Sequence, residues 1–315
     1  MPLPVLFQFK RSHMQQHFPP DLNPHILGIV MREVVRRAML VIFAQRFTHT
    51  IEAKLDYNGN PGDLRSSADI DAQAMYAKIL RETFPQIGIV AEEHDLSIPC
   101  THPTHDLYFT VDPLDGTKAY ARRESQGIAT MISLVCNEVV IASCIGNPLT
   151  GEVFYTRPQS KYVHLLQNNL PVTLPLRGFP VVVLTERYAV IRDRPEKYSL
   201  FVQTLLRDPE HEGLFKNYNI ESGSIGIMFS RLWTNVFGAT ILKPGWQTPW
   251  DLSPLIVISR RMGFVFMHIC PEEKTFELFD PTAKKEKYFE PCETMVIHHT
   301  NLSDLSAFTV TDTRT

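Results

Sequence analysis

The sequence predicts a mixed protein whose first half is an α+β unit and whose second half is an α/β unit. Two helical patterns followed by a run of short apolar strands predict the α+β half. Strand patterns then alternate with helical ones, which is typical of an α/β half. The change from consecutive strands to alternating strands and helices places a boundary near residue 160. The chain is therefore expected to comprise a disordered lead-in over 1–20, a first half over 21–160 and a second half over 161–315.

The first half opens with two amphipathic helices. Apolar residues recur at steps of three or four over 24–41, behind a cap at Asp21 or Asn23. A second helix is expected over 67–84, with Asp69 in the first turn, where the helix dipole favours an acid. A loop at 58–63 separates the two helices. The strands of this half are expected at 87–90, 107–111, 128–135, 139–146 and 152–156.

The second half alternates strand and helix signals. We expect strands at 181–185, 235–242, 263–269 and 275–279. We expect helices over 195–206 and 251–262, and a loop that enters a helix over 221–233.

Composition limits the classes of function. The chain of 315 residues is 44% hydrophobic and 21% charged, which is typical of a globular protein. Its net charge of −3 argues against a nucleic-acid polymer as partner. The longest apolar segment, 26–47, is interrupted by charged residues, so we expect no membrane partner. Five scattered cysteines and the absence of a secretory signal favour a cytoplasmic protein with reduced thiols.

The stretch VDPLDGTKAY at 111–120 places Asp112 and Asp115 three positions apart behind an apolar strand. A surface turn is one interpretation, since Pro, Asp and Gly are common turn residues. The alternative is a cation-binding corner, in which both carboxylates and the Leu114 carbonyl turn toward one point. Gly116 would then let the chain approach a ligand closely, and a helix starting there would offer free N–H groups to an anion.

Two further acids occupy comparable positions. Glu92 closely follows the strand expected at 87–90, and Asp251 opens a helix after a proline-containing loop. Each has an ordinary explanation alone, as a solvated acid or a helix cap. Together they favour a hard cation, because Mg²⁺ binds through carboxylates and substrate phosphate.

Three boxes in this order, AEEHD, VDPLDGTKAY and PWDLSP, make the chain similar to the inositol monophosphatase family. This is the lithium-sensitive, magnesium-dependent phosphatase superfamily, and the resemblance covers roughly residues 25 to 270. It implies a layered α-β-α-β-α sandwich of the sugar-phosphatase type and a homodimer. It also implies that loops after the Glu pair cover the site.

The resemblance also implies roles for individual residues. Two or three Mg²⁺ ions, with Mn²⁺ as a substitute, would be bound by Glu92, Asp112, Asp115, Asp251 and the Leu114 carbonyl, with Asp69 holding a further ion or its water. Thr117, oriented by Glu92 or Asp69, would position and help deprotonate the attacking water. Phosphate and substrate would be bound by Gly116, Thr117, Gly223 and Ser224.

The substrate is expected to be a small phosphorylated molecule. An inositol monophosphate or a similar sugar or polyol phosphate is the first choice. The alternative is 3′-phosphoadenosine 5′-phosphate, the substrate of a 3′(2′),5′-bisphosphate nucleotidase, because Lys243 suits an anionic substrate better than a neutral polyol. Arg122 or Arg123 is either a second contact for substrate charge or a surface residue. A third hypothesis is a non-catalytic binding protein of the same fold.

Cys100, His102 and His105 suggest a zinc site by residue type. No fourth ligand at finger spacing follows them, so we favour a polar loop between two strands.

Overall fold

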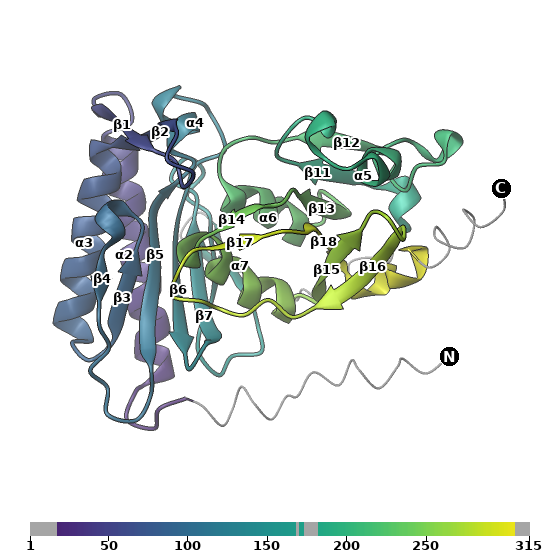
Figure 1. Cartoon of the computed structure of the whole chain (residues 1–315). Coiled ribbons are helices and arrows are strands. Elements are labelled where there is room, and N and C mark those ends of the chain that lie inside the picture. Colours follow the sequence, from purple (N-terminus) through teal and green to yellow (C-terminus); the bar gives the residue numbers. More distant parts are fainter. Residues whose placement is uncertain (1–17, 168–169, 173–181, 306–315) are drawn as a thin grey trace.

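Residues 18–167, 170–172 and 182–305 are described by a computed structural model, which arranges them in alternating α and β layers (Figure 1). Helices α2 (Pro24–Ala44) and α3 (Ser67–Thr83) form one outer layer. Helices α6 (Ile225–Trp233) and α7 (Pro249–Arg261) lie between the two large sheets. Helix α5 (Leu200–Leu205) lies beyond the second sheet. The α-β-α-β-α sandwich is therefore confirmed.

The first large sheet has eight strands in the order β10-β9-β8-β7-β6-β5-β3-β4. Only the pairing between β3 and β5 is parallel among its described strands, so the sheet is mostly antiparallel. Its strands are β3 (Gly88–Ala91), β4 (Ser97–Ile98), β5 (Leu107–Asp115), β6 (Ala129–Cys136), β7 (Val139–Gly146), β8 (Val153–Thr156), β9 (His164–Gln167) and β10 (Leu170–Val172).

The second large sheet has six strands in the order β12-β11-β13-β18-β15-β16. Its strands are β11 (Tyr188–Ile191), β12 (Asn217–Ile220), β13 (Ala239–Leu242), β15 (Phe264–Cys270), β16 (Thr275–Phe279) and β18 (Glu293–His298). Two small antiparallel pairs complete the fold: β1 (Ile51–Leu55) with β2 (Pro61–Ser66), and β14 (Gly245–Gln247) with β17 (Tyr288–Glu290).

Three apolar cores hold the layers together. The first joins α2 and α3 to one face of the eight-stranded sheet, around residues such as Val34 and Phe109. The second fills the space on both sides of α6 and α7, with Trp233 fully buried in it. The third lies between the six-stranded sheet and α5, around Phe215. Each helix therefore buries an apolar face against a sheet, which is what stabilises a layered fold.

The structure corrects the expected strand at 181–185. Residue 181 lies outside the described residues, and Leu184–Glu186 form a 3₁₀ turn instead. The amide of Leu184 donates to Asp304, and the carbonyl of Val182 accepts from Asn301, so side chains rather than a sheet satisfy this backbone. The strand β11 begins only at Tyr188.

Three other expectations need smaller corrections. The helix expected over 195–206 is divided into a 3₁₀ turn at Pro195–Lys197 and α5, because Ser199 caps a new helix. The loop expected at 58–63 is shorter, since β2 begins at Pro61. Helix α7 begins at Pro249, behind its cap Thr248, so Asp251 lies inside its first turn.

Other expectations lie partly outside what the structure describes. Of the lead-in expected over 1–20, only residues 18–20 are described. The first large sheet continues beyond residue 160 through β9 and β10, and the division into two halves stays a prediction. Among the described residues, no helix is long and apolar enough to cross a membrane.

Three glycines join the eight-stranded sheet to the layer of α6. Gly116 directly follows β5 with a φ of 95°, in the left-handed region, and precedes the short helix α4 (Thr117–Ala121). A Cβ atom there would overlap the carbonyl oxygen of Gly127 and lie 3.0 Å from the amide nitrogen of Ser224. Gly127 in turn accepts the Ser224 amide at 2.9 Å, and a Cβ atom on Gly223 would lie 2.7 Å from the same carbonyl oxygen. Only residues without side chains permit this approach.

We expect Gly116→Ala to lower the free energy of unfolding by several kcal/mol, measured by urea denaturation. The left-handed backbone alone costs a non-glycine residue about 1–2 kcal/mol, and the overlap with Gly127 adds to it. Gly151→Ala is the matched control, because Gly151 has a φ of 75° and no atom within 4 Å of its added Cβ. Equal losses in the two variants would contradict the close packing at Gly116.

Candidate metal centre

Three aspartates from two layers meet at one point. Asp112 and Asp115 lie at the end of β5, where the pairing with β6 is irregular, and Asp251 lies in the first turn of α7. One carboxylate oxygen from each lies within 4.8 Å of the other two. Asp112 and Asp115 are 1% and 6% exposed, so they are not the solvated acids of a surface turn. The structure brings these predicted ligands together.

The start of α7 fixes Asp251. Thr248 caps the helix and accepts the Asp251 amide at 3.2 Å through its hydroxyl oxygen. The same hydroxyl donates to the Asp251 carboxylate at 2.8 Å, which orients the side chain. Pro249 occupies the first helical position, where its missing N–H has no cost.

The start of α6 fixes Asp115. Its carboxylate accepts the Ser224 hydroxyl at 2.5 Å, the Ile225 amide at 3.2 Å and the Gly226 amide at 2.8 Å. Ser224 also caps α6 by accepting the Ile227 amide at 3.0 Å. This geometry gives Ser224 a positioning role behind Asp115, and its contact with substrate stays a prediction.

The carboxylates disfavour one another's charged forms. Burial raises the pKa of Asp112 well above its ordinary value, and the nearby charges of Glu92 and Asp115 add to this shift. Burial also raises the pKa of Asp115 to about 6, with a further contribution from Asp251. A cation would relieve this repulsion. Because all donors are oxygens, the set fits a hard divalent cation such as Mg²⁺.

Glu92 faces a lysine that the sequence did not point to. The Nζ atom of Lys54, on β1, lies 2.8 Å from Glu92 Oε1 and 3.1 Å from Glu93 Oε1. Burial lowers the pKa of Lys54, but the two carboxylates outweigh it and raise the pKa overall. Burial also raises the pKa of Glu92 to about 8, although Lys54 lowers it. Asp251 contributes to the same increase, and Glu92 in turn raises the pKa of Asp112, so Glu92 lies within electrostatic range of two of the three aspartates.

Asp69 and Thr117 form a second group beside the aspartates. Thr117 Oγ1 lies 3.1 Å from Asp69 Oδ1 and 3.1 Å from the Leu114 carbonyl oxygen. Asp69 Oδ2 accepts the Ser66 hydroxyl at 2.5 Å and the Ser66 amide at 2.8 Å, in the capping box of α3. Burial raises the pKa of Asp69 to about 7. Asp69 therefore contacts Thr117 directly, whereas Glu92 is paired with Lys54.

The predicted Lys243 directly follows β13 and is paired with another side chain. Its Nζ atom lies 2.8 Å from Asp193 Oδ2. The preceding residue, Arg192, was missed in the sequence, although it donates to the Gly223 carbonyl at 2.6 Å and lowers the pKa of Asp115. Only its position directly after an apolar strand could have drawn attention to it.

The hairpin of β1 and β2 contributes several residues to a cavity beside Glu92. A cavity of about 410 Å³ is lined by Lys54, Tyr57, Glu92, Trp246 and neighbouring residues. Burial raises the pKa of Tyr57, and the nearby charges of Glu92, Asp251 and Asp112 raise it further. Trp246 donates to the Asn58 side chain at 2.8 Å, which joins the hairpin tip to β14. No local pattern predicts this contact, because its partners are remote along the chain.

His94 and Asp95, which follow the Glu pair directly, line this cavity, whereas the loop at 100–105 does not. Its expected role as cover of the site stays a prediction. The Cys100 thiol lies 3.3 Å from the Gln86 carbonyl oxygen, and His102 lies 3.2 Å from Asp21. These contacts hold Cys100 and His102 within the loop, and the choice between a polar loop and a zinc site stays a prediction. Arg122 pairs with Glu124 at 2.6 Å.

Comparison with known proteins decides the family. A model of the inositol monophosphatase family matches residues 27–298. The chain belongs to the inositol monophosphatase family. It is 30% identical over 139 residues to the 3′(2′),5′-bisphosphate nucleotidase CysQ of Aggregatibacter actinomycetemcomitans, an alignment that covers 43% of this chain and 48% of that protein. It is 27% identical over 123 residues to an inositol-1-monophosphatase of Synechocystis, covering 39% and 42%. The chain thus aligns with about half the length of these curated relatives.

Solved structures share the family's layered fold. The inositol monophosphatase of Anabaena (Nostoc) matches with a TM-score of 0.64 at 17% identity, over 92% of this chain and 97% of that chain. An IMPase/NADP phosphatase complexed with NADP and Ca²⁺ matches with a TM-score of 0.68 at 14% identity, over 91% and 96%.

We expect Asp112→Asn to stabilise the metal-free protein, because it removes one charge from the buried cluster and keeps an acceptor for the Leu114 amide. In EDTA, its Tm should rise by about 2–4 °C, which corresponds to about 1 kcal/mol. Added Mg²⁺ should raise the Tm of the wild-type protein more than that of the variant. Asp71→Asn, on the exposed side of α3, serves as the control. A lower Tm for Asp112→Asn in EDTA would contradict the repulsion.

Proposed function

We propose that this chain is a divalent-cation-dependent phosphoric monoester hydrolase. The observation that carries the proposal is the meeting of Asp112, Asp115 and Asp251, whose oxygens lie within 4.8 Å of one another. Membership of the inositol monophosphatase family supports the same activity. An IMPase/NADP phosphatase of this fold is known complexed with Mg²⁺ and phosphate, which supports a divalent metal as cofactor.

The three aspartates, the Leu114 carbonyl and Glu92 would hold the metal. Two or three Mg²⁺ ions, replaceable by Mn²⁺, are the expected number and kind. When bound, such ions supply Lewis-acid polarisation of the phosphoryl group, promote deprotonation of water and offset charge on the leaving oxygen. For Glu92 to join the set, its carboxylate has to divide its contacts between Lys54 and the ion.

Asp69 and Thr117 would orient the attacking water. When Thr117 donates its proton to Asp69, at 3.1 Å, its oxygen is left to accept a hydrogen bond from water. The raised pKa of Asp69, about 7, suits a group that takes up a proton near neutral pH. The amides of Gly116 and Thr117, at the start of α4, would bind the phosphate.

An inositol monophosphate or a similar sugar or polyol phosphate is the first proposed substrate. The similarity to an inositol-1-monophosphatase supports this choice. A bisphosphate nucleotide such as 3′-phosphoadenosine 5′-phosphate is the second, supported by the similarity to CysQ. Arg192, which donates to the Gly223 carbonyl, adds positive charge near Asp115, and this favours a substrate with a second anionic group. Lys243 would contribute as well if a substrate replaced its partner Asp193.

Two further features belong to this proposal. A homodimer is expected from the family resemblance, and size-exclusion chromatography with light scattering tests it. A cytoplasmic location is expected from the odd number and scattered positions of the cysteines.

We expect Thr117→Ala and Asp69→Asn to lower kcat by about a hundredfold to ten-thousandfold, the usual contribution of general acid–base groups. Thr117→Ser keeps the hydroxyl and should retain most of the activity. Phosphate release gives kcat and KM, and Mg²⁺ titration checks that the variants still bind the cation. Full activity of Thr117→Ala would contradict the proposed role.

A substrate panel tests the reaction itself. Phosphate release from an inositol monophosphate and from 3′-phosphoadenosine 5′-phosphate should require Mg²⁺ and cease in EDTA, and Li⁺ should inhibit it. If the nucleotide is the substrate, Lys243→Ala should raise its KM about tenfold, or about 1.4 kcal/mol. Lys216→Ala, at an exposed and distant lysine, should leave it unchanged. Mg²⁺ binding without hydrolysis of any panel member would support the non-catalytic hypothesis.

A further inference from the structure

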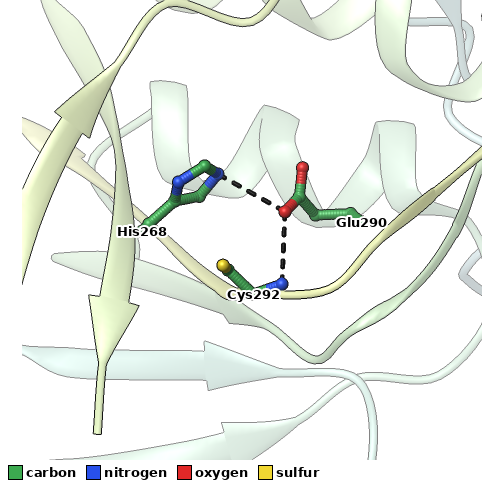
Figure 2. Close-up of side chains that lie close together, drawn as sticks. All are labelled: His268, Glu290 and Cys292. Atoms are coloured by element: carbon green, nitrogen blue, oxygen red, sulfur yellow. Dashed lines mark hydrogen bonds and ion pairs between the residues drawn. The ribbon is translucent and has the colours of Figure 1, made fainter.

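A second cluster of side chains with metal-binding donor atoms lies where the six-stranded sheet meets the small sheet of β14 and β17. His268 is on β15, Glu290 ends β17, and Cys292 lies in the turn that enters β18 (Figure 2). One donor atom from each lies within 4.8 Å of the other two. None of these elements carries a carboxylate of the candidate metal centre, so the cluster is distinct from it.

The donor set has the chemistry of zinc. Imidazole nitrogen, thiolate sulfur and carboxylate oxygen are the side-chain ligands that Zn²⁺ takes, whereas Mg²⁺ takes oxygen. Tetrahedral bonds of zinc to nitrogen and oxygen place the two ligand atoms about 3.3 Å apart. In the structure, His268 Nε2 lies 3.4 Å from Glu290 Oε1. This pair already has the spacing of two zinc ligands.

The imidazole of His268 is held in one orientation, but its Nε2 atom has no hydrogen bond to a described residue. His268 Nε2 is buried and has no hydrogen-bond partner among the described residues, so its contact with Glu290 lacks hydrogen-bond alignment. The ring stacks on Phe279 with centroids 3.8 Å apart and planes 20° apart, which fixes its orientation. A buried polar atom without a partner costs free energy, and coordination of a metal would remove that cost.

The other two ligands are also held in place. The Cys292 amide donates to Glu290 Oε1 at 3.2 Å, so the carboxylate is oriented by the same turn that carries the thiol (Figure 2). The side chains of His268 and Glu290 are 25% and 14% exposed, and Cys292 is half-buried. The cluster is therefore sheltered and still open to an ion from solvent.

We propose that His268, Glu290 and Cys292 form a zinc site, with water in the fourth position. Binding converts the Cys292 thiol to a thiolate and releases its proton to solvent, while Nε2 of neutral His268 donates its lone pair. The site joins β17, in the small sheet with β14, to β15 in the large sheet. Glu290 on β17 pairs with Gly245 on β14, and the next residue of β14, Trp246, lines the cavity beside Glu92.

Cobalt substitution tests the site without using activity. The full chain is freed of metal, kept reduced and titrated with CoCl₂ in excess Mg²⁺, which occupies the carboxylate centre. We expect one equivalent of Co²⁺ to give a thiolate-to-cobalt charge-transfer band and one equivalent of ZnCl₂ to abolish it. The band reports a cysteine ligand, so it arises independently of the oxygen-only centre and of the proposed phosphatase activity.

Variants then assign the ligands. Cys292→Ser should abolish the band, and His268→Gln should weaken Zn²⁺ binding by more than about a hundredfold, since losing even an outer partner of a ligand costs about 10- to 100-fold. Cys100→Ser is the matched control, because that thiol also lies near two histidines but outside the cluster. It should leave both the band and the affinity unchanged.

Three outcomes would overturn the proposal. The first is a wild-type protein that gives no thiolate band with Co²⁺. The second is a band that survives Cys292→Ser or is lost in Cys100→Ser, which would place the metal elsewhere. The third is unchanged Zn²⁺ affinity in His268→Gln, which also decides the question if Cys292→Ser does not fold.

Discussion

The convergence of buried acids is the constraint on which the rest of this structure depends. Asp112, Asp115 and Asp251 are brought within 4.8 Å of one another from two separate layers. Like charges at this spacing repel strongly when water is excluded. Neighbouring groups offset this repulsion by stabilising the carboxylates. The start of α6 donates to Asp115, the hydroxyl of the α7 cap donates to Asp251, and Lys54 is paired with Glu92. The glycines at 116, 127 and 223 are needed because the two layers must approach this closely.

Much of the centre could be predicted because its acids lie in short local motifs. Asp112 and Asp115 are separated by two residues behind an apolar strand, and Asp251 follows a proline-containing loop, so residue type and spacing pointed to them. Lys54 and Arg192 gave no comparable signal. Their roles arise from contacts with Glu92 and with Gly223, 38 and 31 positions away along the chain. Such contacts are set by tertiary packing, which local patterns do not encode.

The difference between local patterns and tertiary contacts also explains which helices and strands the sequence predicts. The helices at 24–44 and 67–83 and the central strands have long apolar patterns, and the structure confirms them. The expected strand at 181–185 has the composition of a strand, but its backbone is bound by Asp304 and Asn301 near the end of the described chain. The short strands β14 and β17 exist because they pair with each other, and neither sequence is apolar enough to predict it.

The pairing of Lys54 with Glu92 has a consequence for the hairpin of β1 and β2. One carboxylate cannot give its full interaction to an ammonium group and to a divalent ion at the same time. If Glu92 binds a cation as proposed, cation binding and the anchoring of the hairpin would be coupled reciprocally, since each would weaken the other through a shared ligand. The hairpin would then be held less firmly at Glu92 when the cation is bound.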